Sequence, residues 1–190
     1  PLNIQDIIAP KDTVKLLNKI VSSGEMPNLL LYGSAGIGKT TTARAIGKDL
    51  QMDVKYINGS LETSIDNIRN DVRTFATTNS LMGGKKLVIL DEADRISAQG
   101  QDALKVVLEE TADIARFIFC TNNMQKIIDP LHSRCSLISF NYASKHTKEI
   151  MLQYFKRVCF ILDNEQVPYD KKLIAGFIQN LYPDFRKIIN

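Results

Sequence analysis

The stretch Gly33-Ser34-Ala35-Gly36-Ile37-Gly38-Lys39-Thr40 decides the fold, because it matches the phosphate-loop pattern GxxxxGK(S/T) at every fixed position. The glycines of this pattern let the backbone wrap so that its N–H groups point at phosphate oxygens, and the next helix adds its positive N-terminal end. Lys39 would bring a cation to the β- and γ-phosphates, and the Thr40 hydroxyl can ligate Mg²⁺. We therefore expect these eight residues, and Thr41 after them, to bind a nucleoside triphosphate.

Apolar patterns on both sides of this loop alternate between strand and helix. Short apolar runs predict five strands, at residues 29–32, 54–58, 87–90, 116–120 and 137–140. Helical spacing of apolar residues predicts helices near 14–21, 39–50, 65–75 and 97–108. This alternation predicts an α/β fold, in which a parallel five-stranded sheet is flanked by helices on both faces.

An acidic pair at the end of the third predicted strand supplies the second half of such a site. The run 87–90 is wholly apolar, as is typical of a central parallel strand, and Asp91-Glu92 follows it directly. Asp91 would help to hold the Mg²⁺, and Glu92 would polarise the attacking water as a general base. An acidic surface turn is the alternative, but next to a phosphate loop the pair favours hydrolysis of a nucleoside triphosphate.

The pattern changes after residue 143. Two helical stripes follow, Ile150-Tyr154-Val158-Leu162 and Leu173-Ile174-Phe177-Leu181. A third helix is expected to begin at Asp184, whose carboxylate can cap it. We therefore predict a P-loop ATPase domain at 1–143 and a small helical lid domain at 144–190.

Composition and charge exclude several other classes of protein. Hydrophobic residues make up 44% of the 190 residues and charged residues 24%, which is ordinary globular usage. The apolar runs are too short to span a bilayer, so no membrane partner is expected, and we see no signal pattern at the N-terminus. The three cysteines lie far apart, which argues against a disulfide scaffold or a zinc ribbon. The net charge of +3 does not by itself indicate nucleic-acid binding. We expect a cytoplasmic protein, in the host cytoplasm if it is viral.

Three further motifs point to a particular family of ATPases. They are Cys120-Thr121-Asn122-Asn123, Ser133-Arg134-Cys135 and Pro183-Asp184-Phe185-Arg186-Lys187. With the phosphate loop and the acidic pair, the chain resembles the AAA+ ATPases and, among them, the sliding-clamp loader ATPase subunits, most closely the large subunit of T4-type bacteriophages. The resemblance covers essentially the whole chain, and its most diagnostic part is the Ser-Arg-Cys triplet.

The resemblance implies roles for two polar side chains at strand ends. Asn122 resembles sensor 1, which helps to hold the attacking water or the γ-phosphate. Asn58 resembles the switch residue that restrains the catalytic Glu92 until DNA is engaged. The alternatives are that Asn122 caps a turn and that Asn58 is an ordinary turn residue.

Two arginines and two isoleucines complete the site that the resemblance implies. Arg134 resembles an arginine finger, which acts on ATP held by a neighbouring subunit, and Arg186 resembles sensor 2, which reaches ATP in the same chain. Ile7 and Ile8 fall where family members pack the adenine and ribose. Both arginines have the alternative of being ordinary solvated side chains, although a cation in the first turn of a helix, as at Arg186, is unfavourable without another purpose.

The resemblance also implies contacts with the DNA backbone. Candidates are Arg69, Arg73 and Arg95, together with the helix N-terminus that begins at Ser97. Such contacts would be independent of sequence and sensitive to salt. An ordinary solvated helix face is the alternative for each of them.

We therefore expect an ATP-dependent subunit that loads a ring-shaped sliding clamp onto primer–template DNA, within a pentamer of loader subunits. A helical collar domain holds such pentamers together, and none of the residues here corresponds to it. The alternatives are another AAA+ replication or recombination ATPase (an initiator, a helicase loader or a branch-migration motor) or a non-catalytic scaffold subunit. A small P-loop kinase would leave Ser133-Arg134-Cys135 unexplained. Asp91-Glu92-Ala93-Asp94 spells DEAD, but an RNA helicase of that type needs a second RecA-like domain, for which 190 residues leave no room.

Overall fold

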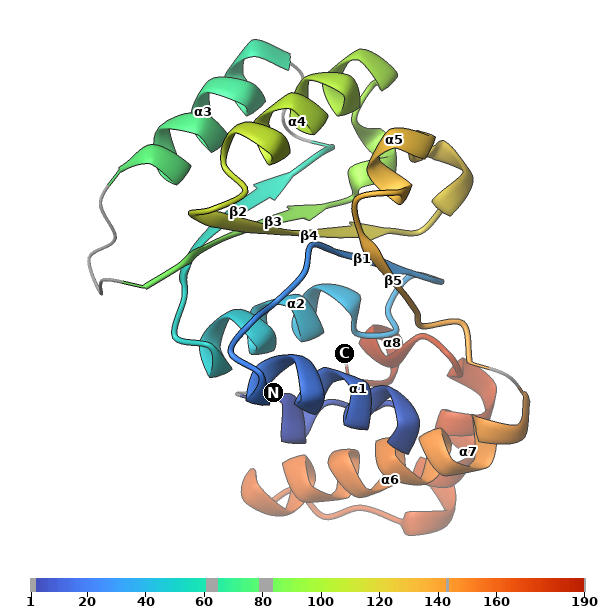
Figure 1. The fold of residues 1–190 in the computed structure, drawn as a ribbon. Coiled ribbons are helices and arrows are strands. Elements are labelled where there is room, and N and C mark those ends of the chain that lie inside the picture. Colours follow the sequence, from blue (N-terminus) through green and yellow to red (C-terminus); the bar gives the residue numbers. More distant parts are fainter. Residues whose placement is uncertain (1–2, 61–64, 79–83, 143, 190) are drawn as a thin grey trace.

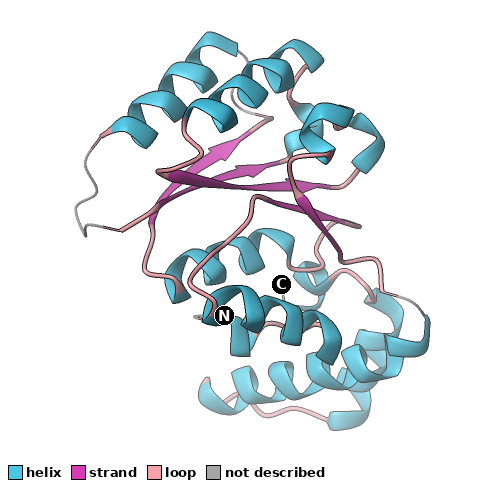
Figure 2. Ribbon diagram, in the orientation of Figure 1, coloured by secondary structure: helices cyan, strands magenta, loops and turns pink. Residues whose placement is uncertain are grey.

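The computed structural model describes residues 3–60, 65–78, 84–142 and 144–189. A parallel sheet lies at its centre, between layers of helices (Figure 2). Its strands are β1 (Leu29–Tyr32), β2 (Asp53–Asn58), β3 (Lys86–Asp91), β4 (Ala115–Thr121) and β5 (Ser136–Ser139). The strand order is β2-β3-β4-β1-β5, and every pair is parallel. The predicted five-stranded parallel sheet is confirmed, and the carboxyl ends of all strands meet at one edge.

Helices cover both faces of the sheet (Figure 1). The helices of one face are α1 (Lys11–Ser22) and α2 (Lys39–Asp49), and those of the other are α3 (Ile65–Thr77), α4 (Ala98–Glu110) and the short α5 (Asp129–His132). Each face has its own buried apolar cluster, and β3 contributes to both because its residues 86–90 are all buried. This explains why the run 87–90 is apolar without alternation.

Three further helices, α6 (Thr147–Asn164), α7 (Lys171–Leu181) and α8 (Phe185–Ile189), pack together around a separate apolar cluster. They lie on the α1 and α2 side of the sheet (Figure 1). Asp184 caps α8 as predicted, since its Oδ1 accepts a hydrogen bond from Lys187 N at 3.4 Å. Short 3-10 turns complete the fold at Ile4–Asp6 (η1), Ala93–Arg95 (η2), Met124–Lys126 (η3) and Ser144–His146 (η4).

The predicted stripe on α7 is wrong in two positions. Leu173 and Phe177 remain 65% and 62% exposed, whereas Ile174 and Ile178 are buried against α6. Both pairs, Leu173–Phe177 and Ile174–Ile178, have i, i+4 spacing, so periodicity alone cannot choose between them; the packing of α7 against α6 buries the isoleucine pair.

The predicted elements otherwise agree with the structure to within about three residues at their ends, and the largest difference is at α1, which begins three residues earlier than predicted. The last strand begins and ends one residue earlier than predicted. The division at residue 143 falls on a position outside the described residues, and the two-domain organisation remains our proposal. In the part of the chain that is described, we find no helix with the length and apolar character needed to cross a membrane.

Candidate nucleotide-binding site

The phosphate loop connects β1 to α2 at the carboxyl edge of the sheet. Gly36 and Gly38 have φ values of +75° and +98°, in the region that favours glycine over every residue with a Cβ atom. Gly36 also touches the start of α8: its carbonyl accepts from Phe185 N at 3.1 Å, and a Cβ on it would lie 1.9 Å from Asp184 Oδ1. The loop therefore connects the sheet, through β1, to α8, the last helix.

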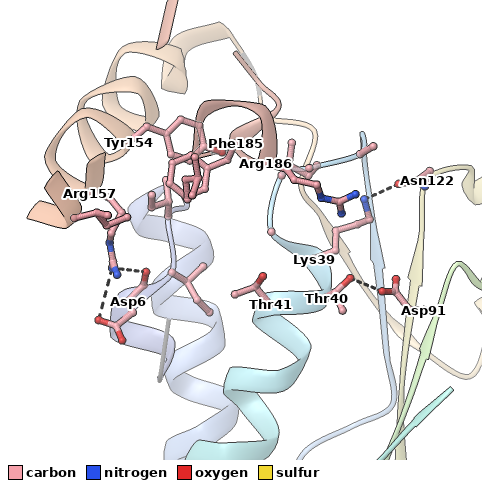
Figure 3. A pocket seen from close by; sticks show the side chains of 18 of the residues that line it. Asp6, Lys39, Thr40, Thr41, Asp91, Asn122, Tyr154, Arg157, Phe185 and Arg186 are labelled. Atoms are coloured by element: carbon pink, nitrogen blue, oxygen red, sulfur yellow. Dashed lines mark hydrogen bonds and ion pairs between the residues drawn. The ribbon is translucent and has the colours of Figure 1, made fainter. Parts of the chain in front are cut away.

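Lys39 is the most enclosed charge of the loop, with 7% of its surface exposed. Its Nζ donates to the carbonyls of Gly33 and Ser34 at 2.8 and 2.7 Å. It also donates to Asn122 Oδ1 at 2.8 Å (Figure 3). Burial lowers the pKa of Lys39. Three oxygen acceptors use the full donor capacity of the ammonium group, so binding a phosphate here means exchanging an acceptor.

Thr40 and the acidic pair lie next to Lys39. Thr40 Oγ1 donates to Asp91 Oδ2 at 2.7 Å, and Glu92 N donates to Asp91 Oδ1 at 3.0 Å. Glu92 adopts φ +51°, which is unusual for a residue other than glycine, and its side chain lines the same cavity as Thr40. Backbone strain of this kind is concentrated at functional sites.

These residues fit a magnesium ion that arrives with a nucleotide. Mg²⁺ is usually bound by one or two protein oxygen ligands together with phosphates and water, rather than by a cage of side chains. Thr40 and Asp91 supply such oxygens, 2.7 Å apart. The described residues contain no group of three or more His, Cys, Asp and Glu side chains suited to an independent metal site.

A cavity of about 470 Å³ extends from the phosphate loop to the C-terminal helices. This is the size of a small-molecule site. The predicted residues that line it are Ile7, Ile8, Ala35, Gly36, Ile37, Gly38, Lys39, Thr40, Thr41, Asp91, Glu92, Asn122 and Arg186. Gly33 and Ser34, also predicted, offer their carbonyls to Lys39.

Six lining residues were not predicted as site residues: Asp6, Tyr154, Arg157, Ile161, Phe185 and Ile189. Figure 3 labels four of them, Asp6, Tyr154, Arg157 and Phe185, and these lie at the end of the cavity far from Asp91. Tyr154 stacks on Phe185, with ring centroids 4.2 Å apart and planes inclined by 7°. The apolar spacing of Tyr154 on α6 identified it as a core residue, and only the fold reveals that one side of that core is a cavity wall.

The same helix holds the N-terminal segment that carries Ile7 and Ile8. Gln153 Nε2 donates to the Ala9 carbonyl at 3.1 Å, and Arg157 Nη2 donates to the Asp6 carbonyl at 2.9 Å. Arg157 also forms an ion pair with the Asp6 carboxylate at 3.7 Å. The two carbonyls stand on either side of the isoleucine pair, so α6 fixes this part of the wall.

Residues 29–142 match the family described as "ATPase family associated with various cellular activities (AAA)". The chain belongs to this AAA family. It is 38% identical to the replication factor C small subunit of Sulfurisphaera tokodaii and 34% identical to the sliding-clamp-loader large subunit of Enterobacteria phage T4. Both matches cover 100% of the chain but only 58% and 60% of the relatives, so the chain spans about three fifths of their length.

Among solved structures, this AAA chain resembles the RuvB Holliday junction branch migration motor of Thermotoga maritima. The TM-score is 0.75, and the match covers 100% of the chain and 62% of the motor. At 22% identity this likeness describes the fold alone.

Two further predicted residues of the AAA chain form hydrogen bonds within the chain and do not line the cavity. Asn58 Oδ1 accepts from the N and Oγ of Ser60, at 3.0 and 2.8 Å, which is the geometry of a strand-end turn rather than a contact with Glu92. Arg134 is exposed just beyond α5. Its Nε donates to Glu109 Oε1 at 3.0 Å and its Nη1 to the Pro130 carbonyl at 2.9 Å, and it is not among the described residues that line the cavity.

The candidate DNA contacts lie on α3 and around the start of α4. Arg69 is half-buried, Arg95 is exposed, and Arg73 is exposed but pairs with Glu110 at 3.4 Å. Ser97 caps α4 as predicted, because its hydroxyl accepts from Gly100 N at 3.2 Å. These positions are on the face of the sheet opposite α6 and α7 (Figure 1).

Proposed function

We propose that this chain binds ATP with Mg²⁺, hydrolyses the ATP, and forms the ATPase part of a subunit that loads a sliding clamp onto DNA. The observation that carries the proposal is that Lys39, Thr40, Asp91, Glu92 and Asn122 line the same cavity. Membership of the AAA family and similarity to clamp-loader subunits over the full chain support the choice among ATPases.

The chemistry follows from the positions of the side chains. Mg²⁺ would neutralise charge on the β- and γ-phosphates, and Thr40 and Asp91 would hold it. Lys39 would exchange a carbonyl acceptor for phosphate oxygens. Glu92 would accept a proton from the attacking water, and Asn122 would orient that water or the γ-phosphate. Arg186 lines the cavity in the same chain and would stabilise charge that develops on the phosphate.

Arg134 would act on ATP in a neighbouring subunit. Its exposed guanidinium group is held by Glu109, away from the cavity of its own chain, and it can be redirected when a second subunit approaches. A role in a neighbouring subunit would explain why Arg134, in a motif that resembles the clamp-loader triplet, lies on the surface. Asn58 keeps its proposed switch role only if its side chain leaves Ser60 and turns to Glu92.

The proposed partners are a sliding clamp, primer–template DNA and further loader subunits in a pentamer. We propose DNA backbone contacts from Arg69, Arg73, Arg95 and the α4 N-terminus at Ser97, independent of base sequence. Residues 1–143 would form the ATPase domain and 144–190 its lid, and the subunit would work in the cytoplasm, or in that of a host cell. Initiators, helicase loaders, branch-migration motors and scaffold subunits remain alternatives with less support.

The test uses the full-length protein with its partner subunits, clamp and primed DNA, and measures the rate of ATP hydrolysis. We expect clamp and DNA together to stimulate that rate, and no stimulation would contradict the clamp-loader proposal. Arg134→Ala should abolish the stimulation while ATP still binds. Glu109→Gln is the matched control: it breaks the same ion pair but keeps the guanidinium group, so it should retain stimulation. Equal loss in both variants would reduce Arg134 to a structural role.

A further inference from the structure

Tyr56 makes a contact with Asp91 that the proposed mechanism does not use. It lies on β2, the edge strand beside β3, and its hydroxyl donates to Asp91 Oδ2 at 2.8 Å. Thr40 donates to the same oxygen at 2.7 Å. Tyr56 is not among the described residues that line the cavity.

The ring of Tyr56 is held in place rather than free on the surface. The guanidinium carbon of Arg44, on α2, lies 4.7 Å from the ring centroid, which is the geometry of a cation–π contact. The ring is 39% exposed, and the neighbouring position on that face of β2, Val54, is 43% exposed.

The donors around Asp91 leave it little freedom. A carboxylate offers about four lone-pair sites. Oδ2 accepts from Thr40 and Tyr56, and Oδ1 accepts from Glu92 N, so three donors from α2, β2 and the chain beyond β3 orient the group. One acceptor site is left for the metal or its water. Without the Tyr56 hydroxyl, Oδ2 would have Thr40 alone, and Thr40 is also a proposed metal ligand.

We propose that Tyr56 is a positioning residue for Asp91, and that its hydroxyl increases the affinity of the site for Mg²⁺ when a nucleotide is bound. The inference rests on the proposed nucleotide site but not on clamp loading. Partners that orient a metal-binding side chain typically contribute about 10- to 100-fold to metal affinity or activity. The fixed orientation of Asp91 is lost when the hydroxyl is removed, whereas the ring and its contact with Arg44 remain.

The experiment measures ADP binding to the full-length protein by calorimetry, first in EDTA and then across a titration of Mg²⁺. In Tyr56→Phe, we expect the Mg²⁺ concentration for half of the affinity gain to rise by about tenfold. ADP affinity in EDTA should not change, because the ring still packs against Arg44. ADP is used so that hydrolysis does not enter the measurement.

Tyr169→Phe is the matched control, because the Tyr169 hydroxyl also donates to a carboxylate, Asp163 Oδ1, at 2.9 Å, but away from the cavity. It should behave as the unaltered protein does. Arg44→Met, which frees the ring, should shift the Mg²⁺ midpoint in the same direction by less than Tyr56→Phe.

The outcomes distinguish a failure of the positioning role of Tyr56 from a failure of the proposed nucleotide site. An unchanged Mg²⁺ midpoint in Tyr56→Phe, or a tighter one, overturns the positioning role although the nucleotide site stands. An equal loss of ADP affinity with EDTA and with Mg²⁺ shows a structural role instead and also overturns it. If the unaltered protein binds no ADP, or binds it without any effect of Mg²⁺, the proposed function fails and the inference fails with it.

Discussion

The two ends of the cavity are built in different ways. At the phosphate end, backbone of the loop and polar side chains at strand ends surround Lys39, whose contacts come from residues near it in sequence or from an adjacent strand. At the other end, apolar and aromatic side chains of α6 and α8 meet the N-terminal segment. The difference teaches that chemistry is encoded locally at the phosphate end, whereas the shape of the opposite end depends on how distant elements pack. Variants at the first end should change catalysis, and variants at the second should change affinity.

The largest effect is expected from Glu92→Gln at the phosphate end. The amide keeps the size of the side chain but cannot accept a proton, and a general base contributes about 10²- to 10⁴-fold to a rate. We expect ATP hydrolysis to fall by that factor while ATP affinity is retained, as measured by single-turnover hydrolysis and equilibrium binding. Unaltered hydrolysis would remove Glu92 from its role. A large loss of ATP affinity instead would contradict the idea that variants at the phosphate end change catalysis rather than affinity.

A smaller effect is expected from Gly36→Ala. Gly36 belongs to the phosphate loop and contacts the start of α8, so it connects the two ends of the cavity. A Cβ on Gly36 would meet Asp184 Oδ1 at 1.9 Å, and φ +75° is unfavourable for alanine by about 1–2 kcal/mol. We expect the loop to relax out of this shape, so that ATP binding must restore it; because about 1.4 kcal/mol corresponds to tenfold, ATP affinity should fall by roughly tenfold.

Gly176→Ala provides the control for this substitution. Gly176 lies within α7, and a Cβ there would have nothing within 4 Å, so the change should raise helix stability slightly, by up to about 1 kcal/mol. Comparable loss of nucleotide affinity in both variants would mean that the docking of α8 on the loop is unimportant.

The next prediction concerns the opposite end alone. Arg157→Ala removes a hydrogen bond and an ion pair to Asp6, and Gln153→Ala removes one hydrogen bond to Ala9. A hydrogen bond made by a charged group contributes about 1.5–3 kcal/mol and a neutral one about 0.5–1.5 kcal/mol. Because the Arg157–Asp6 contact is partly exposed, we expect Arg157→Ala to cost a free energy in the lower part of the range for charged groups.

The readout distinguishes the two ends directly. Affinity for ATP should fall several-fold in Arg157→Ala and by less in Gln153→Ala, whereas affinity for inorganic triphosphate should not change. Lys156→Ala, an exposed neighbour on the same helix, should leave both affinities unaltered. If triphosphate affinity falls in parallel with ATP affinity, these side chains support the whole fold rather than one wall of the cavity.

Sequence reasoning named most of the residues that the structure brings together at the phosphate-loop end of the cavity, for a physical reason. Gly33 to Thr40 is contiguous, and the parallel sheet brings Asp91 and Asn122 to the same edge without any further information. The opposite end depends on contacts between residues 144 and 151 positions apart, and no local pattern reports them. Tyr56 was missed for a related reason: alternation on an edge strand does not reveal which side chain reaches across to the next strand.

The smallest effect on nucleotide binding is expected from α7, which supplies none of the described cavity-lining residues and where periodicity alone misidentified the buried face. Phe177 and Leu173 fit the apolar stripe, yet the structure leaves them exposed and buries Ile178 at 2%. Ile178→Ala should cost about 2–5 kcal/mol of unfolding free energy, as for other buried large-to-small changes, whereas Phe177→Ala should stay within about 0.5 kcal/mol. Thermal or denaturant unfolding of the two variants measures the difference. Equal destabilisation would mean that α7 packs by its predicted stripe in solution.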